Sequence, residues 1–345
     1  MKRRIWFLDI IRVIAFVFII FYHMAVQLPS DGICDVTRVT PFYLNANLHI
    51  ATLGVTLFFM ISGAGLMLGS LQEFDLKTYF KKRFVRILIP FYIVYLCVLC
   101  VKLIVNPQNT FIPGIPLWTV IFTVLGIDTY VSTCGIVSFT LGIGEWFLGC
   151  LIMIYVLFPL LRFCMKKKPV ITFLAATVYY LVMIYFYPFQ KVPMHMNFFV
   201  KIYGFILGMF LILYWEKIKK WTLALTLPVI AIFLFYPAVI PVLDELKTTV
   251  LSIAVFVTAV SLESIVERSS RVQKFLKGFC GIHYELFLVH HVIIQAITGA
   301  VCEKVVSVWG VLVLFICELI AMSAAAVILK KTEGLLEKVF AKRKT

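Results

Sequence analysis

The chain carries about ten apolar stretches, each long enough to cross the roughly 30 Å hydrocarbon core of a bilayer. The bilayer interior offers no water to unpaired backbone groups, and a helix satisfies those groups within a single stretch. Of the 345 residues, 62% are hydrophobic and 14% are charged, whereas soluble domains are about 45–50% apolar and about 25% charged. We therefore predict an all-α polytopic membrane protein with about ten transmembrane helices. The predicted spans are 5–28, 47–69, 85–105, 145–164, 169–188, 198–215, 221–239, 247–265, 278–299 and 306–329.

The basic residues lie in short runs between these stretches, which gives most of them a topological meaning. If the first span starts in the cytoplasm, 25 of the 32 Lys and Arg residues fall on the cytoplasmic side, six fall outside, and Arg12 lies within the first helix. The positive-inside rule favours this orientation, so we expect a multi-pass protein of the cell membrane with both termini in the cytoplasm. A net charge of +15 spread in this way does not form a continuous basic surface, and we expect no nucleic-acid partner.

Residues 117–141 do not fit the alternation of spans. They begin apolar and turn polar from Asp128 onward, and counting them as a span would move the basic run 166–168 to the outside. We expect a re-entrant or peripheral segment on the outer face. The predicted organisation is one transmembrane domain over 1–332, followed by a short basic cytoplasmic tail over 333–345.

The first predicted helix holds three ionisable residues, Asp9, Arg12 and His23. Such groups are costly inside a bilayer, and each marks a candidate site. Arg12 and His23 are eleven residues apart, so they share one helix face and lie about 16 Å apart along the axis. A structural interpretation stays open: Arg12 could reach the interface or pair with Asp9, and His23 could be an interhelical hydrogen-bonding residue.

Arg83 and Arg86 are spaced three residues apart where the third predicted helix begins. Both guanidinium groups therefore share a face at the cytoplasmic mouth of that helix. Paired guanidinium groups suit the phosphates of a cytosolic ligand. An anchor for lipid headgroups is the alternative.

Two later segments add further candidates. Glu145 stands where an apolar stretch begins, and the helix dipole favours a carboxylate there, which is also a sufficient structural explanation. His290 and His291 lie in the ninth span. Because adjacent helical residues point about 100° apart, we expect that the two cannot share one small polar pocket and that only one is functional. His49, at the outer start of the second helix, is the weakest candidate.

Five short motifs follow one another between residues 8 and 290. They are Leu8-Asp9-Ile10-Ile11-Arg12 with His23, Leu57-Phe58-Phe59-Met60-Ile61-Ser62-Gly63, Arg83-x-x-Arg86-Ile87-Leu88-Ile89-Pro90, Trp146-Phe147-Leu148 with Tyr155 and Pro159, and Phe287-Leu288-Val289-His290. In this order they resemble acyltransferase family 3, the integral-membrane O-acyltransferases of bacteria. The chain departs from that pattern at His283-Tyr284 and Phe287, where a Ser-Tyr and a Tyr-Leu-x-His are usual.

The resemblance implies a ten-helix fold that transfers an acyl group, usually acetyl, from cytosolic acyl-CoA to a hydroxyl of a cell-surface or lipid-linked glycan. It implies that Arg12 and His23 are the essential pair of the first helix. It also implies that Arg83 and Arg86 serve the CoA side, together with Arg12. We expect acyl-CoA, with acetyl-CoA as the usual form, as the donor substrate. No metal ion is expected.

Acyl transfer to a hydroxyl needs a base, stabilisation of the oxyanion and an anchor for the anionic donor. His23 is the expected base or transient acyl carrier, because imidazole titrates near pH 6.5, and Arg12 is expected to bind or orient the donor. Glu145 and His290 are expected to orient His23 if their helices close around it. The alternative function is a secondary transporter or glycan exporter, because buried His, Arg and Glu residues are equally expected there.

Overall fold

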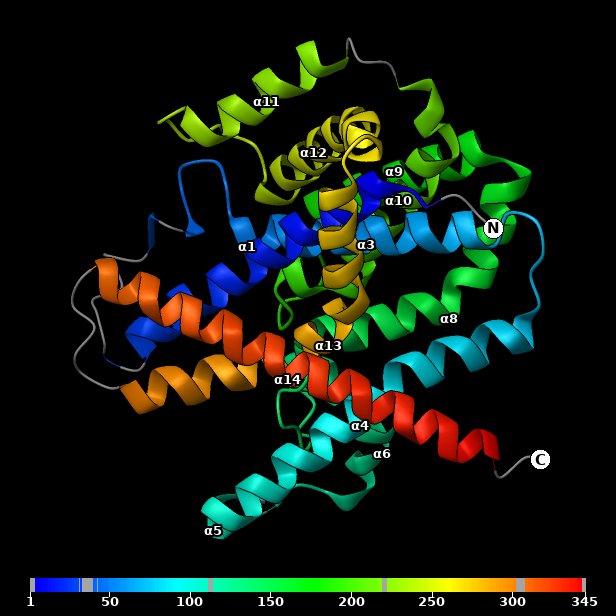
Figure 1. Cartoon of the computed structure of the whole chain (residues 1–345). Coiled ribbons are helices and arrows are strands. Elements are labelled where there is room, and N and C mark those ends of the chain that lie inside the picture. The colour runs from blue at the N-terminus through cyan, green and yellow to red at the C-terminus, as the bar shows by residue number, and fades with distance from the viewer. Residues whose placement is uncertain are drawn as a thin grey trace. The chain divides into compact units, whose positions relative to one another are not determined.

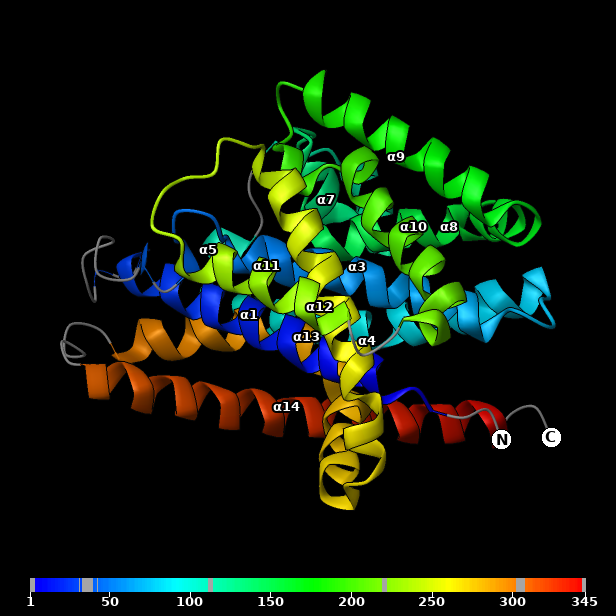
Figure 2. The same ribbon diagram turned by 90° about the horizontal axis from the view of Figure 1, so that it is seen from above.

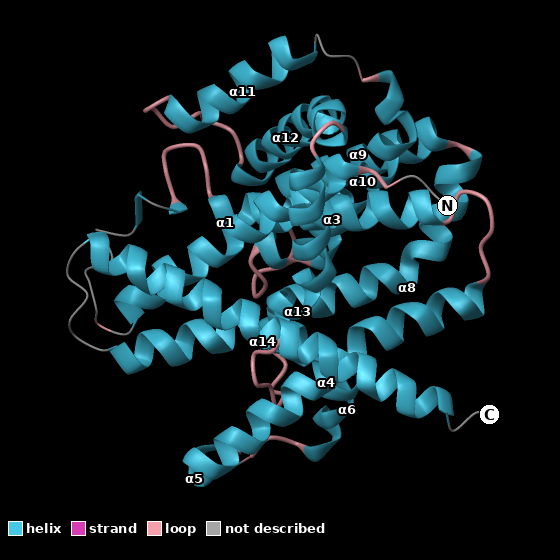
Figure 3. Cartoon of the chain, viewed as in Figure 1, coloured by secondary structure: helices cyan, strands magenta, loops and turns pink. Residues whose placement is uncertain are grey.

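The computed structural model describes residues 4–30, 32, 40–41, 43–110, 114–218, 222–301 and 308–342. Within these ranges the regular structure is helical (Figure 3). The one exception there is an isolated bridge between Leu44 and His49. Eight of the helices described there are long and apolar enough to cross a membrane. Two shorter apolar helices, α9 (Pro169–Tyr185) and α11 (Leu223–Phe235), complete the ten predicted segments. The long helices are α1 (Trp6–Ser30), α3 (Ile50–Gly69), α4 (Leu76–Val105), α8 (Glu145–Lys167), α10 (Phe198–Tyr214), α12 (Asp244–Glu267), α13 (Ser270–Val301) and α14 (Val308–Lys342) (Figure 1).

This architecture confirms the prediction of an all-α polytopic membrane protein, but several helices are longer than their apolar stretches. α4 and α13 both begin before the predicted spans, and α14 continues to Lys342 without a break at residue 332. Apolar content marks only the part of a helix that matches the hydrocarbon core, whereas Lys, Arg and Glu are also good helix formers. At the start of α4 the Asp75 side chain accepts a hydrogen bond from the Thr78 amide at 2.7 Å. That cap sets the helix start at a residue which the hydropathy pattern does not mark.

Residues 117–141 form three short helical pieces, and none of them is long enough to span a bilayer. The pieces are η1 (Leu117–Thr119), α6 (Val120–Val124) and α7 (Asp128–Thr133). Gly126 and Gly135 have positive φ angles of 69° and 82°, a conformation that interrupts helices and that glycine adopts readily. The expectation that this segment does not cross the membrane agrees with these lengths, and its re-entrant or peripheral position stays a prediction.

The helices group into two compact units, which we describe separately. The first unit comprises Met1–Ser30, Cys34–Phe74 and Met153–Gly281, and the second comprises Asp31–Ile33, Asp75–Ile152 and Ile282–Thr345. The boundary between the units falls inside α8 and inside α13. The single transmembrane domain over 1–332 stays a prediction.

In the first unit α3 lies between α1 and α10, and α12 packs against α1, α3 and α11 (Figure 2). Glycine permits the closest approach, between α3 and α10. A Cβ atom on Gly208 would overlap the carbonyl oxygen of Met60, and one on Gly63 would overlap that of Phe205. Small residues bring helix backbones together in membrane proteins, where packing replaces the hydrophobic effect as the driving force. The helix that carries Arg12 and His23 therefore rests on a tightly packed layer.

In the second unit α4 packs against α14, and side chains join the start of α8 to the later part of α13. The Phe147 and Phe287 rings meet edge to face with centroids 5.3 Å apart. The Tyr284 hydroxyl donates a hydrogen bond to the carbonyl oxygen of Ile87 at 2.9 Å. These contacts fix the neighbourhood of Glu145 and of the two histidines of α13.

Candidate functional site

Asp9 holds Arg12 near the start of α1. The Asp9 carboxylate is buried, and it accepts hydrogen bonds from Arg4 Nε at 2.6 Å and from Arg12 Nη1 at 2.5 Å. One carboxylate thus serves two guanidinium groups, so one positive charge remains uncompensated by this contact. The Arg12 side chain keeps 20% of its surface accessible. The pairing with Asp9 considered for Arg12 is therefore present, and the part of Arg12 in donor binding stays a prediction.

Glu263 fixes the start of α1, and the sequence did not indicate it. The amides of Trp6 and Phe7 donate hydrogen bonds to Glu263 Oε1 and Oε2 at 3.2 and 2.7 Å. The first amides of a helix have no partner within the helix, and a carboxylate is favoured at that end. The available signal was an acidic residue near the end of a predicted span, more than 250 residues away. α12 therefore sets the position of α1, and with it the positions of Arg12 and His23.

His23 lies toward the far end of the same unbroken helix and next to a cluster of aromatic rings. The Tyr22 and His23 rings have centroids 5.2 Å apart. The Tyr22 ring also lies 5.4 Å from the rings of Tyr43 and His49. Packed rings of this kind present apolar faces together with polar edges. We name Tyr22, Tyr43 and His49 the aromatic cluster.

His49 itself has a structural task, because it caps α3. Its Nδ1 atom accepts a hydrogen bond from the Thr52 amide at 3.4 Å and lies 3.2 Å from Thr52 Oγ1. Nδ1 accepts only when it carries no hydrogen, so the cap requires a neutral ring with its hydrogen on Nε2. The cap gives His49 a sufficient reason to be where it is.

The first unit also contains a buried ion pair, and the sequence analysis missed it. Lys201 Nζ donates to Glu245 Oε2 at 2.8 Å, and the two side chains are only 3% and 9% exposed. The Tyr180 hydroxyl donates to the backbone carbonyl of Glu245 at 2.9 Å. Buried charges persist only when they are paired and hydrogen-bonded. This pair therefore joins α9, α10 and α12 at one end of the first unit.

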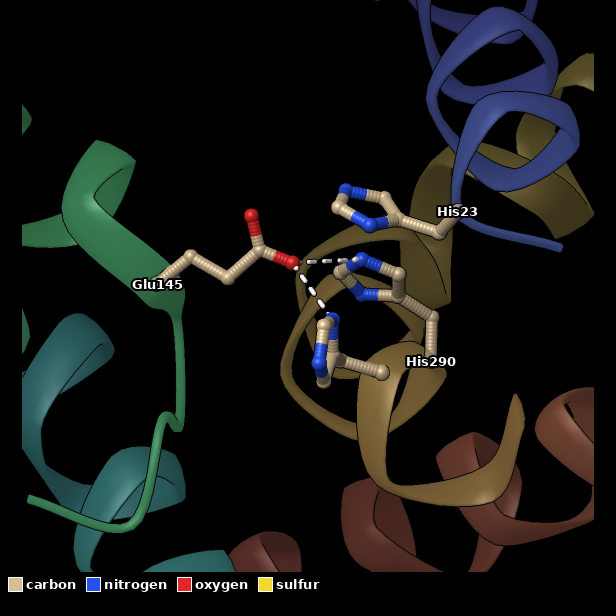
Figure 4. Close-up of side chains that lie close together, drawn as sticks. His23, Glu145 and His290 are labelled. Carbon is tan, nitrogen blue, oxygen red and sulfur yellow. Dashed lines mark hydrogen bonds and ion pairs between the residues drawn. The ribbon is translucent and has the colours of Figure 1, made fainter. Parts of the chain in front are cut away.

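In the second unit Glu145 meets two adjacent histidines of α13 (Figure 4). Glu145 Oε1 lies 2.9 Å from His291 Nδ1 and 3.5 Å from His290 Nε2. Glu145 has a positive φ angle of 48°, and the flanking Gly142 and Gly144 have φ angles of 72° and 73°. A non-glycine residue in this region is strained and persists only where its surroundings hold it. The turn before α8 therefore aims the carboxylate at α13.

The expectation that His290 and His291 cannot share one small polar pocket is wrong, because both rings lie beside the Glu145 carboxylate. Their Cα–Cβ bonds do diverge, but imidazole rings are long enough to converge on an atom that lies between the two directions. Both rings therefore reach the same oxygen of Glu145. The assignment of one functional and one structural histidine loses its geometric basis.

The hydrogen bonds around these histidines place their protons. His290 Nδ1 lies 2.5 Å from the carbonyl oxygen of Phe287, which only accepts, so Nδ1 carries a hydrogen. His290 Nε2 then approaches Glu145 favourably only when one of the two is protonated. The Gln295 amide nitrogen lies 2.8 Å from His291 Nε2, which places the neutral His291 proton on Nδ1, toward Glu145. Glu145, His290 and His291 together can therefore hold a proton.

The same three side chains offer ligand atoms that lie within 4.8 Å of one another, and imidazole nitrogens and carboxylate oxygens are among the ligands of zinc.

Arg83 and Arg86 lie on α4, as predicted, with Arg83 half-buried and Arg86 exposed. Tyr284, from the segment that departs from the family pattern, donates to the carbonyl of Ile87 and holds this turn to α13. Tyr284 thus has a positioning task beside the arginine pair. The binding of CoA by the pair stays a prediction.

The sequence analysis also missed Glu318 and Glu333 of α14 and the pairing of Lys330 with Glu285 of α13. Lys330 Nζ donates to Glu285 Oε1 at 2.7 Å and to Glu333 Oε2 at 3.1 Å, and both carboxylates are buried. Glu318 is fully buried, and neither of its carboxylate oxygens has a hydrogen-bond partner in the described part of the chain. An acidic residue within an apolar stretch was the signal that could have identified Glu318.

The predicted site residues fall in both units. The first unit contains Arg12 and His23, and the second contains the others, which are Arg83, Arg86, Glu145 and His290. Within its unit Arg12 is joined to Asp9, and Glu145 is joined to His290 and His291.

A family model described as an acyltransferase domain matches residues 5–330. No curated protein and no solved structure matches the chain. The matched range covers nearly the whole chain and contains every predicted site residue.

Proposed function

The chain belongs to acyltransferase family 3, and from that premise we propose that it moves an acyl group, acetyl in the first instance, from cytosolic acyl-CoA to a hydroxyl of a cell-surface or lipid-linked glycan. The observation that carries the proposal is α1. This single helix holds Arg12 and His23 on one face, eleven residues and about 16 Å apart. Arg12 is nearer the end that the positive-inside rule assigns to the cytoplasm. An extended CoA arm has a length comparable to the separation between the two residues.

The chemistry assigned to His23 is general base catalysis. A ring nitrogen of His23 accepts the proton of the acceptor hydroxyl while the oxygen attacks the thioester carbonyl carbon. The carbon–oxygen bond forms, and the tetrahedral oxyanion collapses as the carbon–sulfur bond breaks. The departing CoA thiolate takes the proton from His23. Arg12 orients the donor so that its thioester reaches the ring.

The acceptor side of the proposal is supported by the aromatic cluster. Tyr22 lies next to His23, and the rings of Tyr43 and His49 pack on Tyr22 within the first unit. Flat apolar ring faces with polar edges suit a sugar, which has an apolar face and a rim of hydroxyl groups. This favours a glycosyl acceptor over a small linear alcohol.

The second unit supplies the remaining assigned groups. Arg83 and Arg86 present two guanidinium groups on one helix face, which suits phosphates. We assign Glu145 and His290 a part in proton movement during transfer, because a carboxylate oxygen of Glu145 lies 3.5 Å from a ring nitrogen of His290. No step of this scheme requires a metal ion.

The experiment is a transfer assay in membrane vesicles that contain the protein. Vesicles receive acetyl-CoA labelled in the acetyl group, and mass spectrometry with label counting follows the label into extracted glycans. We expect labelled O-acetyl ester only when both donor and protein are present. Movement of glycan across the vesicle membrane without acyl-CoA, and with no ester formed, would instead establish the transporter alternative.

A further inference from the structure

A second group of cations lies in the first unit, where α1 and α13 begin and α12 ends. Arg271, Lys274 and Lys277 follow one another at a spacing of three along the first turns of α13, so neighbours in this series lie side by side on the helix. Arg268 follows the last residue of α12 as its C-cap, and Arg4 precedes α1. All five side chains are exposed. We name these five residues the cationic surface.

A buried tryptophan holds two of these cations in place. The Lys277 ammonium lies 5.4 Å from the centroid of the Trp6 ring, and the Arg4 guanidinium lies 5.2 Å from it. Both distances are typical of cation–π contacts. Trp6 packs with Val266 and Leu276, so the ring between the two cations is anchored in the packed interior of the unit.

The turn between α12 and α13 is fixed as well. The Gln273 amide donates to the carbonyl oxygens of Val266 and Glu267 at 3.1 and 2.9 Å. These bonds tie the first turn of α13 to the last turn of α12. The cations of α13 are therefore presented by a rigid support, which lowers the conformational cost of binding an anion.

The cationic surface continues inward to the proposed donor site. Arg4 belongs to the surface and also donates to Asp9, which in turn accepts from Arg12. Of the acidic residues described at this end, Asp9 already serves two guanidinium groups, and Glu263 serves the amides of α1. Glu267 is exposed, and this one carboxylate does not neutralise the four cations of the surface other than Arg4, which is paired with Asp9. The result is a positively charged path from α13 to Arg12, and α1 continues from there to His23.

We propose that the cationic surface binds phosphate groups at the nucleotide end of the acyl-CoA donor, in addition to the phosphate contact assigned to Arg83 and Arg86. This inference rests on the proposed function and assigns new residues to its donor side. Anionic lipid headgroups offer the same phosphate chemistry. The path through Arg4 and Asp9 to Arg12 favours the donor, because a headgroup anchor needs no continuation inward. A donor whose phosphates remain on the surface would direct its thioester along α1.

The test compares two pairs of substitutions that remove the same charge. Lys274→Gln with Lys277→Gln changes the cationic surface. Lys167→Gln with Lys168→Gln is the control, because both lysines are exposed and lie in the first unit. Lys167, like Lys277, lies over an aromatic ring, with its Nζ 4.3 Å from the Phe163 centroid. Each protein is reconstituted in vesicles of phosphatidylcholine alone and in vesicles that also contain phosphatidylglycerol. The measurements are the Kd of free coenzyme A and, in the transfer assay, the KM for acetyl-CoA and kcat.

In both kinds of vesicle we expect the surface variant to raise Kd and KM about tenfold while kcat stays within twofold, and we expect the control to match the wild type. An unchanged Kd and KM, a wild type that binds no coenzyme A, or a loss confined to vesicles with phosphatidylglycerol would each overturn the inference. The last result would assign the surface to lipid headgroups. If the wild type binds coenzyme A but transfers no acyl group, and the variant loses that binding, the role of the cationic surface is supported and the proposed function is refuted. If the protein transfers the acyl group and the variant has an unchanged KM, the proposed function is supported and the role of the cationic surface is refuted.

Discussion

Replacing Glu263 by Gln should loosen the start of α1, because its carboxylate accepts two buried amide hydrogen bonds. A glutamine keeps one acceptor oxygen, so either Trp6 or Phe7 loses its partner, and the remaining bond loses its charge. An unsatisfied buried donor costs about 1–3 kcal/mol, and a charge-assisted bond is roughly twice as strong as a neutral one. Glu263 is 5% exposed, so solvent screening changes little. The expected loss of unfolding free energy is about 2–4 kcal/mol.

The assay is thermal unfolding of the purified protein in detergent, followed by intrinsic fluorescence. At about 2 °C per kcal/mol for a chain of this size, the Tm of Glu263→Gln should fall by about 4–8 °C. Transfer activity should fall as well, because α1 carries Arg12 and His23. Glu267→Gln is the matched control, since that side chain is exposed one turn further along α12, and its Tm should stay within about 1 °C of the wild type. Equal Tm values for the two variants would refute the assignment of Glu263 as the residue that positions α1.

Two further predictions concern packing and pH. Gly208→Ala places a methyl group against the carbonyl oxygen of Met60 and should destabilise the protein by about 1–3 kcal/mol. The control is Gly65→Ala, whose methyl group meets no atom within 4 Å and should leave stability unchanged or raise it. Equal shifts in Tm for the two variants would contradict the close packing of α3 against α10. Burial raises the pKa of Asp128 to about 6 from its usual 3.8. Between these two pH values the folded state binds more protons than the unfolded state. The free energy of unfolding therefore falls as pH rises from about 4 to about 6, by about 3 kcal/mol in total. The difference in Tm between wild type and Asp128→Asn should change across that range, and a constant difference would show that Asp128 titrates normally.

The sequence predicts the helices well because the cost of placing polar groups in hydrocarbon is large and local. The apolar stretches therefore coincide with the eight long apolar helices of the described chain and with the shorter α9 and α11. Helix ends are less visible, because a charged helix continues into water without any apolar signal. The start of α4 at the Asp75 cap and the extension of α14 to Lys342 are two such helix ends.

Part of the candidate site is likewise predictable from the sequence, and part is not. The shared face of Arg12 and His23 follows from the helical period alone, so the sequence is enough to predict it. The contacts of Glu263 with the first amides of α1, and of Glu245 with Lys201, join segments that are far apart in the chain. One sequence carries no information about which distant segments pair. The angular argument about His290 and His291 was wrong because it considered the directions of the Cβ atoms and ignored the reach of the rings.

The measurement that tests the central claim most directly is acyl transfer by His23→Ala. His195→Ala is the control, because His195 lies in the first unit outside the long helices, in the short η2 (Met194–Met196). Both variants are compared with the wild type at equal abundance in the membrane, with labelled acetyl-CoA as donor. A general base contributes about 10²–10⁴-fold, so transfer by His23→Ala should fall at least about 100-fold while His195→Ala stays within a few-fold of the wild type. Transfer by His23→Ala at a rate close to that of the control would contradict the account.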